Sequence, residues 1–220
     1  MADLIASIGG SFAQVLVGHP FDTAKVLIQN KKSFLNLKPI EYYRGCKYPL
    51  ISSTLTNAVL FPVYERTKNI TNSAFISGYI GGCIISPIVF VSDYYKIFCQ
   101  TDTKNKKPKR SLLKSYGKFS VFCRESIAYG TFFGVYDLLR NDYNYHPIIS
   151  GSICGICNWT VTYPIDVVRN RQIAQQINIY DAIKQKKLYK GFSICFLRSI
   201  FVNAALFYTY DTLYNYLLKI

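Results

Sequence analysis

Charged residues are scarce in this sequence, and long uncharged stretches are common. Asp, Glu, Lys and Arg make up 17% of the 220 residues, whereas hydrophobic residues make up 50%. Soluble domains carry about 25% charged residues, so this composition argues against a soluble globular protein. Uncharged stretches close to the roughly 20 residues of a transmembrane helix cover 4–21, 48–64, 69–92 and 143–165.

Two further apolar stretches, 119–135 and 192–218, are nearly as free of charge. The first is interrupted only by Arg124 and Glu125, and the second by Arg198 and Asp211. Together with the four uncharged stretches they predict an all-α membrane protein with six transmembrane helices.

The sequence also lacks the motifs of several other classes of protein. No nucleophile–base pair and no cluster of metal ligands stands out, so we expect neither an enzyme nor a bound cofactor or metal. Cys154 and Cys157 form the one C-x-x-C pair. They lie in an uncharged stretch without a second such pair, which favours helix packing over a zinc or redox site. The Met-Ala-Asp start resembles neither a secretory signal nor a transit peptide.

Acidic residues are too few to balance the basic ones, and the formal net charge is +14. More than half of the 26 Lys and Arg residues lie in 30–47, 101–118 and 172–190. With six spans these segments follow the first, third and fifth, so they mark one side of the membrane. A nucleic-acid-binding protein would carry such charge on a polar folded domain, so no nucleic-acid partner is expected. The basic loops are instead expected to contact the lipid bilayer, anionic lipid above all.

Three landmarks recur about every 72 residues, which indicates an internal repeat. An acid followed three residues later by a base occurs at Asp22 and Lys25, Asp93 and Lys96, and Asp166 and Arg169; Pro20 and Pro164 precede the first and third pairs, and Val91 stands at the second. A glycine after an aromatic or basic residue occurs at Gly45, Gly117 and Gly191. An aromatic–acid pair occurs at Tyr64-Glu65, Tyr136-Asp137 and Tyr210-Asp211. The predicted repeats are 1–70, 71–143 and 144–220, each with two spans.

The motif P-x-[DE]-x-x-[KR], present twice in full and once with Val91 in place of the proline, and followed each time by the glycine, resembles the mitochondrial carrier family over the whole chain. The resemblance implies six tilted helices around a central cavity. It also implies a multi-pass monomer of the mitochondrial inner membrane that moves a small-molecule substrate by alternating access. Abundant Ile, Lys, Asn and Tyr are typical of an AT-rich genome, and for a viral protein the mitochondrion would be a host's.

The resemblance further implies two rings of ion pairs that open and close the cavity. The matrix-side gate would contain Asp22, Lys25, Asp93, Lys96, Asp166 and Arg169, with Gln29 and Gln100 as braces and Ile173 at the third brace position. The cytoplasmic-side gate would contain Glu65, Lys68, Asp137, Arg140 and Asp211, where Tyr214 replaces the last basic partner. Ionised groups at membrane depth must be paired or face water, which supports such pairing independently. Charges that snorkel to the interface are the simpler alternative. Pro20 and Pro164 are expected to kink their helices.

By the same resemblance, the substrate contacts fall seven residues after each landmark glycine. They are Ser52, Arg124 with Glu125 beside it, and Arg198. An arginine inside a transmembrane helix suits binding of a carboxylate or phosphate, although Arg124 could instead pair structurally with Glu125. An arginine followed by an acid resembles carriers of amino acids, whereas the basic composition leaves nucleotide-like anions open.

Some features depart from the family pattern. The chain is short, and Val91 replaces the second proline. The basic loops leave little room for full helices on the matrix side. A proton-leak carrier and a membrane anchor without transport are the rival functions, but acid–base pairs in all three repeats favour transport.

Overall fold

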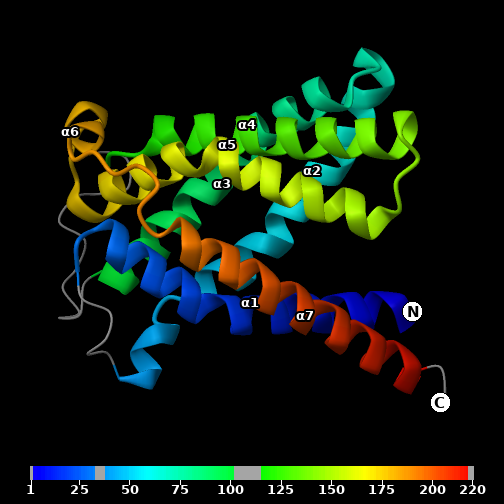
Figure 1. Ribbon diagram of the computed structural model, residues 1–220, viewed down its shortest axis with the longest axis horizontal. Coiled ribbons are helices and arrows are strands. Elements are labelled where there is room, and N and C mark those ends of the chain that lie inside the picture. The colour runs from blue at the N-terminus through cyan, green and yellow to red at the C-terminus, as the bar shows by residue number, and fades with distance from the viewer. Residues whose placement is uncertain (1, 33–37, 102–114, 218–220) are drawn as a thin grey trace. The chain divides into compact units, whose positions relative to one another are not determined.

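The computed structural model describes residues 2–32, 38–101 and 115–217, and these form helices joined by short connections (Figure 1). Six helices of the described part are long: α1 (Ala2–Gln29), α2 (Lys47–Thr71), α3 (Ala74–Thr101), α4 (Lys118–Asp137), α5 (Pro147–Gln175) and α7 (Phe192–Leu217). Three are short: the 3₁₀ helix η1 (Pro39–Tyr43), the π-helical turn η3 (Leu138–Asp142) and α6 (Ile179–Lys184). No strand occurs in the described ranges, so the predicted all-α class is confirmed.

The six apolar stretches of the sequence lie in the six long helices, with two shifts of boundary. The stretch 69–92 is not one helix, because α2 ends at Thr71, Asn72 has a left-handed φ of 52°, and α3 begins at Ala74. The stretch 143–165 begins before its helix, since α5 starts at Pro147. By length and composition alone, one helix in the described ranges, α3, qualifies to cross a membrane.

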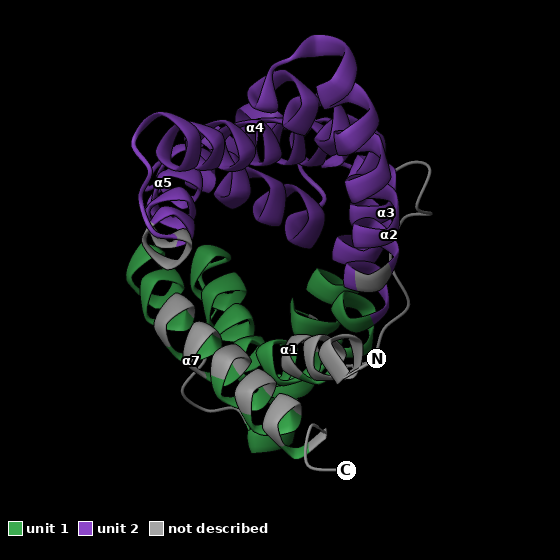
Figure 2. Cartoon of the chain, turned by 90° about the vertical axis from the view of Figure 1, so that its right-hand side faces the viewer, with its two compact units in different colours: residues 1–50, 95–107, 190–220 green, residues 51–94, 108–189 purple. Residues whose placement is uncertain are grey.

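The chain divides into two compact units, coloured separately in Figure 2. Unit 1 contains residues 1–50, 95–107 and 190–220, and therefore joins the two ends of the chain. In it α1 packs against α7: the rings of Phe21 and Phe201 stack with centroids 5.6 Å apart, and Leu213 covers Gly9.

Unit 2 contains residues 51–94 and 108–189. Its α3 and α4 approach closely where Gly78 and Gly82 face the backbone of α4. A β-carbon at either glycine would lie within 2.4 Å of a carbonyl oxygen, that of Tyr129 or Glu125. At these two positions, small residues four apart allow the helices to pack closely. Gly151 and Gly155 on α5 have the same spacing, but a β-carbon there would meet no described atom within 4 Å.

The landmark glycines share one conformation, which explains their residue type. Gly45, Gly117 and Gly191 have φ values of 81°, 101° and 88°. This is the left-handed region that glycine enters without the steric cost of a side chain. Each glycine lies within two residues of the start of a long helix, α2, α4 or α7, so it turns the chain into that helix.

Prolines lie inside helices α1, α2, α3 and α5 without ending them. A proline cannot donate to the carbonyl four residues before it, so that oxygen needs another partner. Pro87 frees the carbonyl of Cys83, which accepts the Ser86 hydroxyl at 2.9 Å. Pro164 frees the carbonyl of Thr160, which accepts the Tyr189 hydroxyl at 3.3 Å. The kinks expected at Pro20 and Pro164 stay a prediction.

The connections after α1 and α5 contain short helices. These are η1, of five residues, and α6, of six residues, in loops where we expected little room for full helices. The buried Arg171 of α5 donates to the carbonyl of Ala182 at 3.0 Å, which ties α6 to α5. The second basic loop falls largely on 102–114, outside the described residues.

Candidate functional site

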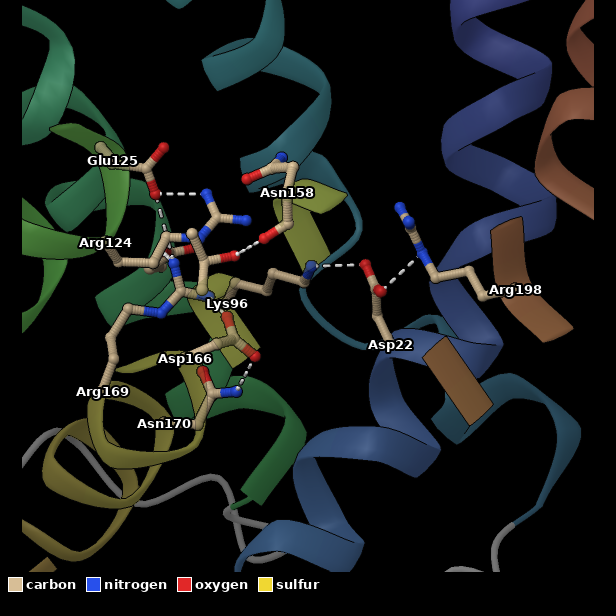
Figure 3. Close-up of polar contacts among 11 residues, drawn as sticks. Asp22, Lys96, Arg124, Glu125, Asn158, Asp166, Arg169, Asn170 and Arg198 are labelled. Atoms are coloured by element: carbon tan, nitrogen blue, oxygen red, sulfur yellow. Dashed lines mark hydrogen bonds and ion pairs between the residues drawn. The ribbon is translucent and has the colours of Figure 1, made fainter. Parts of the chain in front are cut away.

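In unit 1, two cations meet on one carboxylate. Lys96 Nζ of α3 lies 2.7 Å from Asp22 Oδ2 of α1, and Arg198 Nε of α7 lies 2.7 Å from Asp22 Oδ1 (Figure 3). All three side chains are at least three-quarters buried. We call these three residues the Asp22 cluster. Because each of its ion pairs joins two helices, the cluster ties α1 to both α3 and α7.

In unit 2, Arg169 of α5 is the centre of a second group, which we call the Arg169 cluster. Arg169 Nη1 lies 2.7 Å from Asp93 Oδ2 and 3.5 Å from Glu125 Oε1, and Nη2 lies 2.8 Å from Asp166 Oδ1 (Figure 3). Asn170 also donates to Asp166 at 3.3 Å. The cluster therefore links α3, α4 and α5 through one guanidinium.

Arg124 extends the Arg169 cluster through Glu125. Its Nη1 lies 2.5 Å from Glu125 Oε1, and the Glu125 side chain is only 2% exposed. The guanidinium also lies over the ring of Trp159, 5.5 Å from its centroid. The structure thus contains the Arg124–Glu125 pair that the sequence offered as the alternative to a free arginine. The neighbouring arginine and acid neutralise each other inside an apolar helix.

The ion pairs connect equivalent motif positions of successive repeats. Lys96 of the second motif pairs with Asp22 of the first, and Arg169 of the third pairs with Asp93 of the second. Pairing within one motif occurs at Asp166 and Arg169, which are three residues apart. Five of the six predicted gate residues, all but Lys25, are therefore brought into these contacts within one unit or the other, and Lys25 is buried on α1. The closed ring of all six stays a prediction.

The predicted braces lie beside these clusters. Gln100 donates to the Thr23 hydroxyl at 3.0 Å, and the Gln29 side chain is fully buried on α1. Ile173, at the third brace position, is buried against Gly117, where a β-carbon would lie 2.8 Å from its Cγ1. An apolar contact thus occupies the place of the third glutamine.

The residues of the predicted cytoplasmic-side gate are only partly paired. Lys68 Nζ lies 2.7 Å from Asp137 Oδ1, again between successive repeats, and both side chains are about one-third exposed. Arg140 was expected to pair with an acid but donates to the carbonyl of Tyr145 at 2.8 Å. Glu65 is exposed. The side chains of Asp211 and Tyr214 lie outside the described residues.

The predicted substrate contacts are divided between the two units. Ser52 and Arg124 belong to unit 2, and Arg198 belongs to unit 1. Ser52 is half-buried on α2, and its carbonyl accepts the Thr56 hydroxyl at 2.6 Å. Arg124 and Arg198 each lie in a buried ion pair, as described above. That the three residues share one cavity stays a prediction.

Sequence reasoning missed three residues that surround these groups. His19 is buried, and its Nε2 lies 2.9 Å from the carbonyl of Arg44. Thr23 donates to the carbonyl of Tyr42 at 2.7 Å. Trp159 covers Arg124. His19 and Thr23 lie within three residues of Asp22 and could have been found by their place in the repeat, whereas Trp159 has no such position.

The chemistry of both clusters is that of ion binding. Carboxylates, guanidiniums and an ammonium are gathered in largely buried positions, where opposite charges attract strongly and unpaired ones are costly. In the described ranges, no group of three or more His, Cys, Asp and Glu side chains could hold a metal. Such groups can exchange one charged partner for another, which suits reversible capture of a charged small molecule.

Comparison with known proteins finds similar transporters of mitochondria. Residues 140–220 match the family described as "Mitochondrial carrier protein". The "Mitochondrial basic amino acids transporter" of Bos taurus is 27% identical over 97% of this chain and 91% of that protein. The "Mitochondrial glycine transporter YMC1" of Saccharomyces cerevisiae is 28% identical over 95% of this chain and 89% of that protein.

A plant relative is similar over nearly the same share of this chain. The "Mitochondrial arginine transporter BAC2" of Arabidopsis thaliana is 24% identical over 95% of this chain and 89% of that protein. The alignment with the bovine protein extends over 277 residues, whereas this chain has 220. The similarity thus covers nearly the whole chain, with segments of the relative that this chain lacks. Residues 140–220 thus match the mitochondrial carrier family, and the similarity to mitochondrial transporters extends over nearly the whole chain.

Proposed function

We propose that this protein is a solute transporter of the mitochondrial inner membrane and that its substrate is an α-amino acid. The relatives are named as transporters of basic amino acids, glycine and arginine, and a Schizosaccharomyces pombe relative as one of ornithine. These molecules share a carboxylate and an α-ammonium group on one carbon. The substrate site must therefore offer one cation and one anion close together.

The observation that carries the proposal is the buried pair Arg124–Glu125. Arg124 would bind the carboxylate of the substrate, since a guanidinium grips a carboxylate with two parallel hydrogen bonds. Glu125 would accept the α-ammonium. Without substrate the two side chains neutralise each other at 2.5 Å.

A zwitterion fits this pair better than a nucleotide does. Its α-carboxylate and α-ammonium replace one internal ion pair by two, and together these two groups bring no net charge into a buried place. A phosphate chain would add several negative charges beside Glu125, which is 2% exposed and could not be rehydrated there. Burying unpaired charge costs several kcal/mol per ion. We therefore favour the amino-acid class over the nucleotide class, both of which the sequence left open.

In this proposal the six long helices are six spans, two for each tandem repeat. The ion pairs between successive repeats support it, because Lys96–Asp22 and Arg169–Asp93 connect equivalent positions. The resemblance to the mitochondrial carrier family further assigns these pairs to a matrix-side gate and Lys68–Asp137 to a cytoplasmic-side gate. Breaking and reforming such pairs would supply the two states of alternating access.

Exchange in proteoliposomes tests the proposal. Purified protein should exchange labelled L-arginine, L-ornithine or glycine against the same internal amino acid, and Arg124→Ala should abolish the exchange. Lys118→Ala, which removes an exposed cation at the start of the same helix, should not. Trp159 is the one tryptophan of the sequence and stacks on Arg124. Its fluorescence should therefore change when the transported amino acid binds.

Three outcomes would contradict parts of the proposal. Exchange of ATP or ADP without exchange of any amino acid would reject the substrate class. A folded protein that moves no solute but collapses a pH gradient would be a proton-leak carrier. A folded protein that moves neither solute nor protons would be a membrane anchor.

A further inference from the structure

Asn158 of α5 has a side-chain oxygen that lacks a hydrogen-bond donor. The main-chain carbonyl of Asn158 accepts the Thr162 hydroxyl at 2.7 Å. Its side-chain Oδ1 is buried, and in the described ranges this atom has no hydrogen-bond partner. Buried polar atoms almost always have a partner, and an unpaired one destabilises the fold. A buried acceptor of this kind calls for a donor that a bound molecule supplies.

The carboxamide of Asn158 lies at the proposed substrate pair. In Figure 3 it points toward the Arg124 guanidinium, on the side where Arg124 meets Glu125. Trp159, the next residue of α5, covers the same guanidinium, with 5.5 Å between Arg124 Cζ and the ring centroid. All of these residues belong to unit 2. One compact unit therefore contains the cation, the anion and the unpaired acceptor.

Arg124 and Glu125 each use only part of their bonding capacity on each other. Arg124 donates through Nη1 to Glu125, and its buried Nε has no hydrogen-bond partner in the part of the chain that the structure describes. Nε and Nη2 form one planar edge of the guanidinium, the kind of edge that holds a carboxylate with two parallel hydrogen bonds. Glu125 meets both Arg124 and Arg169 through Oε1, so none of these contacts uses Oε2.

The α-groups of an amino acid match these unused atoms. The carboxylate fits the Nε–Nη2 edge of Arg124. The ammonium, like that of a lysine, has three N–H donors, and one oxygen of Glu125 cannot accept all three. Because Glu125 is only 2% exposed, an ammonium beside it has little access to water. A second acceptor from the protein is therefore needed, and Asn158 Oδ1 is available for it.

We propose that Asn158 is a substrate-binding residue whose Oδ1 accepts a hydrogen bond from the α-ammonium of the transported amino acid. Glu125 balances the charge of the ammonium, and Asn158 fixes its direction. The assignment rests on the proposed function for its ligand, but the unpaired Oδ1 does not. Because glycine and the basic amino acids share the α-ammonium, Asn158 serves to bind the whole class and does not select a side chain.

A first test compares Asn158→Leu with Asn69→Leu. Both substitutions replace an asparagine inside a long helix of unit 2 by an apolar residue with the same branching, but Asn69 is exposed on α2. In Asn158→Leu the KM of L-arginine exchange should rise roughly tenfold, about the effect of losing one charge-assisted hydrogen bond. In Asn69→Leu it should stay within about twofold of the wild type. A KM unchanged by Asn158→Leu would overturn the assignment.

Unfolding without a ligand separates substrate binding from a structural role. Because Oδ1 has no partner to lose, the unfolding midpoint of Asn158→Leu should not fall below that of Asn69→Leu. Leucine favours helix more than asparagine does, and the control carries the same gain. A midpoint more than about 2 °C below the control would show that the Asn158 carboxamide bonds within the protein, to Arg124 for example, and would overturn the assignment.

A ligand without the ammonium tests which group Asn158 contacts. The compound δ-guanidinovalerate has the side chain and the carboxylate of L-arginine but lacks the α-ammonium. Trp159 is the one tryptophan of the sequence and covers Arg124, so its fluorescence can follow both titrations. In Asn158→Leu the Kd of L-arginine should rise roughly tenfold, whereas that of δ-guanidinovalerate should change by less than about twofold.

The two ligands also distinguish the ways in which the assignment can fail. Equal weakening of both by Asn158→Leu would attribute the effect to the carboxylate or to packing, and would overturn the ammonium contact. Wild-type protein that exchanges L-arginine but loses no affinity in Asn158→Leu would reject the role of Asn158 alone. Wild-type protein that neither exchanges nor binds any amino acid would reject the proposed function, and this assignment with it.

Discussion

Removing the charge of Glu125 should destabilise the protein strongly. Glu125 accepts Arg124 Nη1 at 2.5 Å and Arg169 Nη1 at 3.5 Å, and its side chain is 2% exposed. In Glu125→Gln the volume is kept, but Arg124, whose side chain is only 16% exposed, loses its ion pair. Leaving one partner of a buried pair without the other costs about 3–5 kcal/mol. Because Arg169 keeps Asp93 and Asp166, we expect the lower end of this range.

The same acid-to-amide substitution at a more exposed ion pair should lower the free energy of unfolding far less. Asp137→Asn removes the carboxylate that holds Lys68 at 2.7 Å, but these side chains are 34% and 38% exposed. Water can solvate the remaining ammonium, and pairs with such exposure contribute about 0–1 kcal/mol. The two substitutions are matched chemically, since each converts an acid to its amide. Burial is the variable that separates them.

Thermal unfolding in detergent, followed with a thiol-reactive dye, measures the difference. The seven cysteines are free, and Cys154 and Cys195 are buried until the protein unfolds. For a chain of this size 1 kcal/mol shifts the midpoint by about 2–4 °C. Glu125→Gln should therefore lower it by roughly 6–12 °C and Asp137→Asn by under about 4 °C. Equal shifts for the two variants, or a Glu125→Gln midpoint within about 2 °C of the wild type, would refute this reasoning.

Two further predictions concern packing and use the same unfolding assay. Gly82→Ala should lower the free energy of unfolding by about 1–3 kcal/mol or more, because its β-carbon would lie 2.4 Å from the Glu125 carbonyl oxygen. Gly155→Ala is the control, since a β-carbon there meets no described atom within 4 Å. A Gly82→Ala midpoint equal to that of Gly155→Ala would contradict the close contact of α3 and α4. Tyr189→Phe should cost about 0.5–1.5 kcal/mol, because it leaves the Thr160 carbonyl without its hydroxyl donor. Tyr180→Phe, at a position that is 74% exposed, is the control. Equal effects of the two substitutions on the unfolding midpoint would show that the Tyr189 hydroxyl does not stabilise the protein through the Thr160 carbonyl.

The landmark glycines were the part of the fold that could be predicted best. Gly45, Gly117 and Gly191 stand in one register, and all three have the left-handed φ that a glycine permits. The places where long helices begin follow from them. The division into two compact units could not be predicted in this way, because it joins residues from both ends of the chain. Such contacts depend on tertiary packing and leave no periodic pattern in the sequence.

The charged residues of the clusters were predictable, but their partners were not. The spacing of three residues suggests pairing along one helix, and Arg169 with Asp166 follows it. Lys96 and Asp22 instead pair between helices, because a long lysine side chain can reach a neighbouring helix as easily as its own. Trp159 was missed since it lies 35 positions from Arg124 and belongs to no repeated motif. Such a contact depends on how α4 and α5 pack.

The arrangement of the clusters implies a link between substrate binding and opening. In unit 1 the arginine assigned to the substrate, Arg198, also holds Asp22 of the proposed gate. In unit 2 Arg124 shares Glu125 with Arg169, which holds Asp93. A ligand shifts a conformational equilibrium only as far as it binds one state better than the other. Under the proposed function, a carboxylate that competed for one of these arginines would weaken the ion pairs within the same cluster. The free energy of substrate binding would thereby be coupled to that of gate opening, with no need for a longer pathway.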